Sequence, residues 1–191
     1  MNFFISVARL LAVAALILAP MSAKQDSAEK QAAEMQPPKP GPEMSRLSFL
    51  LGKWHGVTVY EKTSLFPQGG KSEGPYVAVA GPGGFSQIAD FEASSPMGKE
   101  IGHEVISWVP SENAYKRYVF GNTFPGCIVG TGHWEGESLV FVTDFDFSGK
   151  TMHLRSVTTA NPDGSVKILE SGAVGDTPMQ LLFTTTAKRN P

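Results

Sequence analysis

The side chains with the most evident chemistry in this sequence are its four histidines, His55, His103, His133 and His153. Imidazole titrates near neutral pH and is the commonest metal ligand in proteins. Each histidine falls in a different predicted strand, so the four could meet only inside a closed sheet. The sequence does not fix which face of its strand each one occupies. We therefore expect solvated or singly hydrogen-bonded histidines and predict no metal site.

Two stretches come close to metal-binding motifs. His103-Glu104 could open a zinc-protease helix, but that motif needs a second histidine four residues later, where Ser107 stands. Residues 144–149 place Asp, Asp, Ser and Gly at the spacing that opens a calcium loop, yet the closing position holds Arg155 instead of an acidic ligand. We expect a strand in the first case and the tip of a hairpin in the second.

Motifs for covalent catalysis and phosphate binding are also incomplete. Cys127 is the sole cysteine, so no intramolecular disulfide can form, and the sequence places no base beside its thiol. Gly81-Pro-Gly-Gly84 lacks the lysine and the helix that follow a phosphate-binding loop, which favours a tight turn before Phe85. We predict no catalytic residues, and a binding protein is favoured over an enzyme.

The elements that must position these side chains are short strands. After Gly52, runs of β-branched and aromatic residues alternate with clusters of Gly, Pro, Asn and Asp, a pattern typical of strands joined by hairpins. Because long helices for parallel crossovers are lacking, we predict an all-β fold, a single antiparallel barrel of about eight to ten strands. A two-sheet sandwich is the alternative. The predicted strands span 53–60, 76–80, 85–92, 101–109, 115–120, 127–134, 138–145, 152–159, 166–171 and 178–187.

A short helical turn is predicted immediately before the first strand. Leu47, Phe49, Leu50 and Leu51 form one apolar turn, and Gly52 follows it. Glycine commonly ends a helix because it adopts a positive φ without a Cβ clash. The strand that begins there carries Trp54.

The N-terminal region predicts export. Residues 1–23 combine one basic residue, an apolar run at 10–19 and a small residue at the cleavage position, as a signal peptide does. The run is short for a membrane span of about 20 residues, and an uncleaved anchor is the alternative. Residues 24–41 predict a disordered Pro-rich linker, which leaves 42–191 as the barrel domain. We expect a periplasmic or extracellular protein without a membrane span after cleavage.

Charge composition argues against one class of partner. The chain has 16 basic and 18 acidic residues, a net charge of −2. This near-neutral balance gives no support for a polyanionic ligand, so we expect no nucleic-acid partner. The oligomeric state is not indicated by the sequence.

Several residues carry a family resemblance. Gly52-Lys53-Trp54 resembles the start of calycin-type barrels (lipocalins, fatty-acid-binding proteins and nitrobindin-like proteins), in which the Trp closes one end. A longer pattern comprises Lys39-Pro-Gly-Pro-Glu-Met44, Gly81-Pro-Gly-Gly-Phe85, Gly102-His103, Trp108-Val-Pro110, Tyr115, Gly130-Thr-Gly-His-Trp-Glu-Gly136 and Arg155. Over almost the whole mature chain this pattern resembles an uncharacterised exported bacterial family, number fifteen-seventy-nine among domains of unknown function. The chain departs from it at Val109, where that family usually has Asp. The resemblance implies a lipocalin-like barrel and no established activity.

The resemblance directs attention to Arg155, because it places an arginine at this position. In calycin barrels a basic residue commonly covers the first Trp, and a guanidinium stacked on an indole gains about 0.5 to 2 kcal/mol. We expect Arg155 to cover Trp54 in this way, with Lys188 as a competitor, or to anchor the acidic head of a ligand in the lumen.

The candidate ligand-binding residues are Trp54, His103, Tyr118, His153 and Arg155. In nitrobindin-like barrels a histidine on a late strand ligates haem iron, and His153 is nearest to that position. No motif supports haem, so we predict no cofactor and keep haem on His153 as an alternative.

Fold analogy then suggests a function. The leading prediction is an exported protein that binds a small apolar or amphipathic ligand in the barrel lumen. One alternative is an envelope enzyme that uses His103, Glu104 or Tyr118 as a pocket acid or base. The other is an interaction protein whose lumen is filled by side chains.

Overall fold

The chain enters the fold through a short helical segment. In the computed structural model, which describes residues 38–95 and 98–190, α2 (Pro42–Ser45) runs directly into the 3-10 helix η1 (Arg46–Leu50). Pro42 suits the first helical turn because its missing N–H is not needed there. Gly52, with φ 125°, then opens the first strand. The predicted helical turn is confirmed, and the predicted signal peptide (1–23) and most of the linker (24–41) lie outside the described residues.

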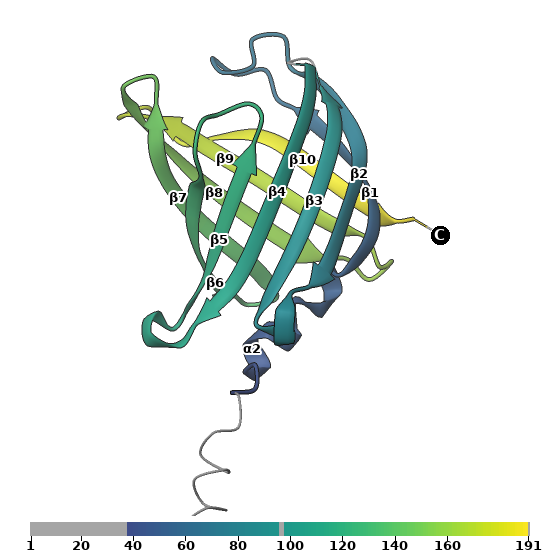
Figure 1. Cartoon of the computed structure of the whole chain (residues 1–191). Coiled ribbons are helices and arrows are strands. Elements are labelled where there is room, and N and C mark those ends of the chain that lie inside the picture. Colours follow the sequence, from purple (N-terminus) through teal and green to yellow (C-terminus); the bar gives the residue numbers. More distant parts are fainter. Residues whose placement is uncertain (1–37, 96–97, 191) are drawn as a thin grey trace, which may run out of the picture. The chain divides into compact units, whose positions relative to one another are not determined.

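Ten strands of the described residues form one closed antiparallel barrel, in which each strand pairs with its sequence neighbours and β1 also pairs with β10. Figure 1 shows the strands wrapping around a common axis, with the helical segment below one end. The predicted all-β barrel is confirmed, and the sandwich alternative is excluded. The strands are β1 (Gly52–Tyr60), β2 (Gly70–Ala80), β3 (Ser86–Ser95), β4 (Gly98–Val109), β5 (Ala114–Gly121), β6 (Ile128–Glu135), β7 (Ser138–Phe147), β8 (Lys150–Ala160), β9 (Val166–Val174) and β10 (Gln180–Arg189).

Alternation along each strand decides which side chains reach the lumen. On β7, Leu139, Phe141 and Thr143 are buried and Val142 and Asp144 are exposed, although Val140 is buried as well. This period of two is the expected consequence of the pleat. On the paired strand β6, Gly130 and Gly132 supply no side chain at inward positions, and a Cβ at Gly132 would collide with the ring of Phe141. The lumen therefore accommodates large side chains from one strand where its neighbour has glycine.

The hairpin that joins β7 to β8 uses two residues with positive φ, Ser148 at 54° and Gly149 at 77°. Two such residues match the twist of an antiparallel pair. The Asp146 carboxylate accepts a hydrogen bond from the Gly149 N–H at 3.3 Å. The predicted hairpin tip at 144–149 is confirmed.

Two other connections contain short 3-10 helices. The Gly81-Pro-Gly-Gly84 turn contains η2 (Pro82–Gly84), and η3 (Pro110–Glu112) joins β4 to β5.

The clearest boundary difference is at β2, which begins at Gly70 instead of residue 76. Gly74 and Pro75 argue against a strand in the sequence because proline lacks an N–H and glycine adds flexibility. In the structure the pairing with β3 keeps one register from Glu73–Ser94 to Tyr76–Phe91, but the ladder is interrupted at Gly74 and Pro75. On the other edge of β2, Pro75 is paired in register with His55 of β1. The strand thus tolerates proline at an interruption of one ladder.

No helix in the described part of the chain is long and apolar enough to cross a membrane. Within the same residues, no group of three or more His, Cys, Asp or Glu side chains is arranged to hold a metal ion. The four histidines lie on β1, β4, β6 and β8 and do not converge.

Candidate functional site in the barrel lumen

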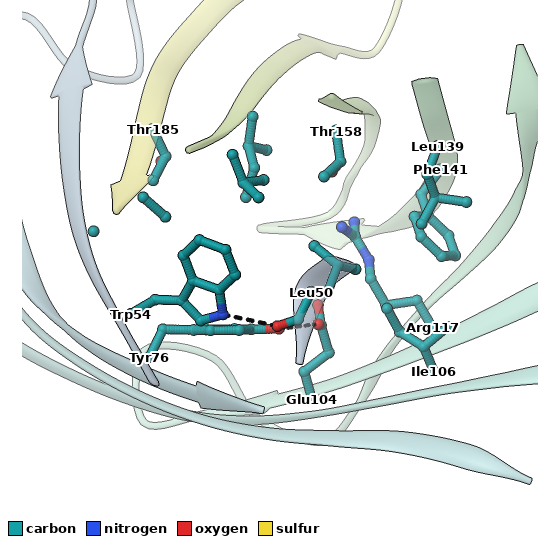
Figure 2. Close-up of a pocket in the computed structure, with 14 residues that line it drawn as sticks. Leu50, Trp54, Tyr76, Glu104, Ile106, Arg117, Leu139, Phe141, Thr158 and Thr185 are labelled. Carbon is teal, nitrogen blue, oxygen red and sulfur yellow. Dashed lines mark hydrogen bonds between the residues drawn. The ribbon is translucent and has the colours of Figure 1, made fainter. Parts of the chain in front are cut away.

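The lumen contains a cavity of about 130 Å³. Most of its wall is apolar, and it is contributed by η1 and eight of the strands. Figure 2 shows labelled side chains from opposite walls pointing toward a shared interior space. The lining residues are Leu50, Trp54, Gly56, Tyr76, Glu104, Ile106, Arg117, Leu139, Phe141, Thr158, Val166, Ile168, Thr185 and Ala187. An apolar wall with a few polar groups is the usual composition of a ligand pocket.

One end of the cavity is closed by the helical segment and Trp54. The indole is 2% exposed, and its Nε1 donates to the carbonyl oxygen of Leu50 at 2.8 Å. Leu47 and Leu50 pack into the same core cluster as Trp54 and Tyr115. Burial of these side chains by the hydrophobic effect holds the helical segment against the barrel end. The expectation that Trp54 closes one end is therefore confirmed.

A second set of hydrogen bonds fixes the helical segment to the barrel. The Tyr115 hydroxyl donates to the carbonyl oxygen of Glu43 at 2.8 Å and accepts a hydrogen bond from Trp134 Nε1 at 3.1 Å. The guanidinium of Arg46 lies over the Trp134 ring, with Cζ 4.2 Å from the centroid. These contacts join α2 and η1 to β5 and β6, so the closed end is a packed structure with satisfied polar groups.

One polar wall of the cavity is built on β2, β3 and β4. The Tyr76 hydroxyl donates to Glu104 Oε1 at 3.2 Å, and Gln87 Nε2 donates to the Tyr76 oxygen at 3.2 Å. Glu104 is enclosed by the barrel but retains some accessible surface because it borders the cavity. This relay holds the Glu104 carboxyl in a defined position (Figure 2).

The opposite polar element is Arg117 on β5. Its guanidinium extends into the cavity in Figure 2 and lies against Phe141, with Cζ 4.7 Å from the ring centroid. Among the described residues no carboxylate oxygen lies within 4.0 Å of an Arg117 nitrogen, and none accepts a hydrogen bond from it. A guanidinium has five donors and stays charged. Arg117 therefore retains its hydrogen-bonding capacity toward the cavity.

Further buried polar groups surround Arg117. Glu170 on β9 is 6% exposed and is paired in register with Ser156 on β8. Ser156 Oγ, Thr143 Oγ1 and Gln87 Oε1 are buried without a hydrogen-bond partner among the described residues. Buried polar atoms in native proteins nearly always have partners. We call these buried polar residues the polar belt, and three of them, Tyr76, Glu104 and Arg117, line the cavity. The belt consists of Tyr76, Gln87, Glu104, Arg117, Thr143, Ser156 and Glu170.

The acidic members of the polar belt, Tyr76, Glu104 and Glu170, have raised pKa values. Burial raises the pKa of Glu104, and the positive charge of Arg117 opposes that shift without cancelling it. Burial also raises the pKa of Glu170, again opposed by Arg117. The pKa of Tyr76 is raised well above its usual value by burial and then by the nearby Glu104 charge. The belt therefore favours the neutral forms of its acids more than water does.

Of the five predicted ligand-binding residues, the structure brings only Trp54 to the cavity. Tyr118 faces outward on β5 and is 36% exposed. His103 and His153 lie on the outer surface, where their Nδ1 atoms pair with Asp90 and Asp144 at 2.7 Å. Because His153 points away from the lumen, it cannot ligate a haem held there.

The prediction that Arg155 covers Trp54 or anchors a ligand in the lumen is wrong. Its Nη2 donates to Glu135 Oε2 at 2.7 Å on the outer face. The residue that covers Trp54 is Arg189, whose Cζ lies 4.4 Å from the indole centroid. Lys188, the predicted competitor, is paired in register with His55 and exposed. Strand parity is the physical reason, because residues 153 and 155 share the outward face of β8.

Sequence reasoning missed Arg117 and Glu170 and named Glu104 only as an alternative acid or base. The available signal was alternation on β4 and β5. Glu104 stands two residues before Ile106, and Arg117 stands two residues after Tyr115. Ile106 and Tyr115 are both buried. A charged residue in the same alternation as buried aromatic and aliphatic neighbours indicates an inward-facing charge.

The comparisons with known proteins support the fold. The sequence matches no family model and no curated protein. The structure is similar to the crystal structure of Rv2717c from M. tuberculosis, with a TM-score of 0.56 and 14% identity over 80% of this chain and 100% of that one. At this identity the likeness establishes the fold alone, a closed antiparallel barrel.

A second similar structure is the S-type phycobiliprotein lyase CPES from Guillardia theta. The TM-score is 0.44 and the identity 15%, over 78% of this chain and 91% of that chain. A likeness at this level is too low to support a functional argument. The resemblance to family fifteen-seventy-nine stays a prediction because no family model matches.

Proposed function

We propose that this protein binds and carries one small apolar or amphipathic molecule in the lumen of its barrel. The observation that supports this proposal is the cavity of about 130 Å³, with its apolar wall and the inward-facing Tyr76, Glu104 and Arg117. Pockets for drug-sized ligands are typically about 300 to 1,000 Å³. The ligand is accordingly small, or only its inner part occupies the lumen.

The proposed place of action is outside the cytoplasm. This part of the proposal rests on the sequence of residues 1–23, which has the features of a secretory signal. Fractionation of the native host followed by N-terminal sequencing tests it. We expect the periplasmic or secreted protein to begin at Lys24, and recovery of the full chain in the cytoplasm would contradict export.

Native mass spectrometry of protein purified from its own host tests ligand binding. We expect an additional mass that is lost on denaturation. Two substitutions on adjacent residues of β10 provide a matched comparison. Ala187→Phe fills the cavity that Ala187 lines, whereas Thr186→Phe adds the same ring at the neighbouring position, outside the cavity lining. The bound mass should disappear in the first variant and persist in the second. A mass retained equally by both variants would place the ligand outside the lumen.

A second candidate function is an enzyme that uses Glu104 as an acid or base. The raised pKa of this carboxyl, caused mainly by burial, and its position beside the cavity support that candidate. An enzyme would release a chemically altered ligand. Incubation of the identified molecule with wild-type protein and with Glu104→Gln, followed by mass analysis of the small molecule, distinguishes turnover from carriage.

A further inference from the structure

The charges around the cavity identify the head group that the lumen is suited to hold. Resting on the proposed function, we propose that Arg117 binds the carboxylate of a small amphipathic acid, with the Tyr76–Glu104 pair as its polar neighbour in the cavity. The acid's apolar part then lies along the wall formed by Trp54, Leu139 and Ile168.

Arg117 is the group that requires an anion. Its guanidinium borders the cavity, packs against Phe141 at 4.7 Å and has no ion pair within 4.0 Å among the described residues. An enclosed charge without a close partner is costly, and arginine cannot reduce that cost by losing its proton. A carboxylate accepts two parallel N–H bonds from a guanidinium. An acidic ligand would therefore supply the contact that the protein does not.

Gly130 on β6 pairs with Arg117 in register and leaves room for the Thr143 hydroxyl. A Cβ at Gly130 would lie 2.5 Å from Thr143 Oγ1 and 3.7 Å from Arg117 Nε. Thr143 Oγ1 has no hydrogen-bond partner among the described residues. The Thr143 hydroxyl and the Arg117 guanidinium thus both lie beside Gly130.

Glu104 is not positioned to neutralise Arg117 directly. Its Oε1 accepts the hydrogen bond of the Tyr76 hydroxyl, and Gln87 donates to that same hydroxyl. Glu170, the other buried carboxyl, is on β9 beside Ser156. Both carboxyls are near enough for Arg117 to lower their pKa values, but neither forms a close ion pair with it. The ligand carboxylate would take the place closest to the guanidinium.

The same groups make binding of the acid depend on pH. The charged or titratable groups that line the cavity are Tyr76 from β2, Glu104 from β4 and Arg117 from β5, and Glu170 from β9 is buried close enough for Arg117 to affect its pKa. With both glutamates ionised, the site carries two negative charges to one positive charge and repels an anion. With both protonated, Arg117 is the only charge and attracts it. Burial favours the protonated forms, so binding of the acid should strengthen as pH falls while the ligand itself stays ionised.

Three probes with the same six-carbon chain and different heads test the proposal: hexanoate, hexanol and hexylamine. Each is titrated into wild-type protein and followed by NMR, including the side-chain Nε–H resonance of Arg117. We expect hexanoate to bind most tightly and to shift that resonance, and its binding to strengthen as pH is lowered while the ligand stays ionised. This comparison uses wild-type protein, so it does not depend on whether a variant folds.

Two variants and a matched control extend the test. Arg117→Gln should weaken hexanoate binding by about tenfold and leave hexanol binding unchanged, because only the charged head loses a partner. Lys116→Gln removes the same charge from the adjacent residue, which pairs with Glu112 outside the cavity lining, and should leave both unchanged. Glu104→Gln should weaken the pH dependence of hexanoate binding, because one of the two titrating carboxyls is removed.

The outcomes separate this inference from the proposed function. Equal binding of all three probes in the lumen would overturn carboxylate recognition and leave the proposed function intact. Tightest binding of hexylamine would also overturn it and assign the head-group site to Glu104 and Glu170. If no probe shifts any resonance of a lumen residue, both the inference and the proposed carriage of small amphipathic molecules fail.

Discussion

Arg189 and Trp54 join the last strand of the barrel to the first. The Arg189 guanidinium lies over the indole at 4.4 Å, and its Nη1 donates to the carbonyl oxygen of Leu51 at 3.0 Å. Arg189 and Trp54 are also opposite each other in the β1–β10 pairing. One side chain thus covers the buried Trp, closes the sheet and satisfies a carbonyl that follows η1.

We predict that Arg189→Ala lowers the free energy of unfolding by about 1 to 2 kcal/mol, because it removes a cation–π contact and a charge-assisted hydrogen bond. Arg155→Ala is the matched control, since it removes an arginine that makes only a surface ion pair with Glu135. Such pairs contribute about 0 to 1 kcal/mol. Urea unfolding monitored by Trp fluorescence measures both. A larger loss for Arg155→Ala than for Arg189→Ala would contradict this assignment.

The Tyr115 hydroxyl gives a second stability prediction. Tyr115→Phe preserves the ring but removes the acceptor for Trp134 Nε1 and the donor for the carbonyl oxygen of Glu43. We expect a loss of about 1 to 3 kcal/mol, as for buried partners left unsatisfied. Tyr118→Phe, on the outer face of the same strand, should change stability by less than about 0.5 kcal/mol. Chemical denaturation of the two variants in parallel checks the difference, and equal effects would argue against a structural role for this hydroxyl.

The fold was accessible from the sequence because turn residues and alternating strands are local signals. Gly52, Trp54 and the hairpin ending at Gly149 lie where the pattern indicated. The sequence predicts that a basic residue covers Trp54, and this is correct. It names Arg155, whereas the residue in the structure is Arg189. Arg155 and Arg189 are both basic residues on late strands, and only the register of β10 with β1 decides which one reaches the indole.

The site was less accessible because it depends on parity and on barrel closure. A shift of one residue moves a side chain from lumen to solvent, so the sequence alone does not decide that His153 and Arg155 lie on the outer face. Arg117 and Glu170 are on strands far apart in the sequence, and their proximity follows only from the closed pairing order. No local motif carries that information.

The buried carboxyls predict how stability depends on pH. Because the pKa values of Glu104 and Glu170 are raised in the folded state above 4.5, the folded protein holds protons that the unfolded chain releases. Stability from these groups is therefore greatest below about pH 4.5 and declines as pH rises through the raised pKa values. The slope is at most about 1.4 kcal/mol per pH unit for each carboxyl.

Replacement of Glu104 by Gln should flatten this decline, because a neutral amide has no proton to lose. Glu92→Gln, which removes a surface carboxyl paired with Lys99, is the control and should leave the slope unchanged. Comparison with wild type also removes contributions from groups of opposite sign, such as Asp163, whose pKa is lowered mainly by a hydrogen bond from the Ser165 side chain. Unfolding curves at several pH values measure the slopes. An identical slope for Glu104→Gln and wild type would show that Glu104 does not titrate differently on folding.

Two glycines that face each other across β1 and β2 should respond oppositely to the same substitution. Gly56 and Gly74 are paired in register. A Cβ at Gly74 would collide with the backbone of Glu92 and Ala93 on β3, whereas a Cβ at Gly56 would meet its nearest atom, Thr185 Cγ2, at an ordinary 3.7 Å. Gly74→Ala should therefore cost more than about 2 kcal/mol, since strand backbone has to move. Gly56→Ala should be neutral or stabilising by up to about 1 kcal/mol, because alanine restricts the unfolded chain. Thermal and urea unfolding of the pair measures the contrast, and tolerance of alanine at residue 74 would mean that the close approach of β2 to β3 is not required for the barrel.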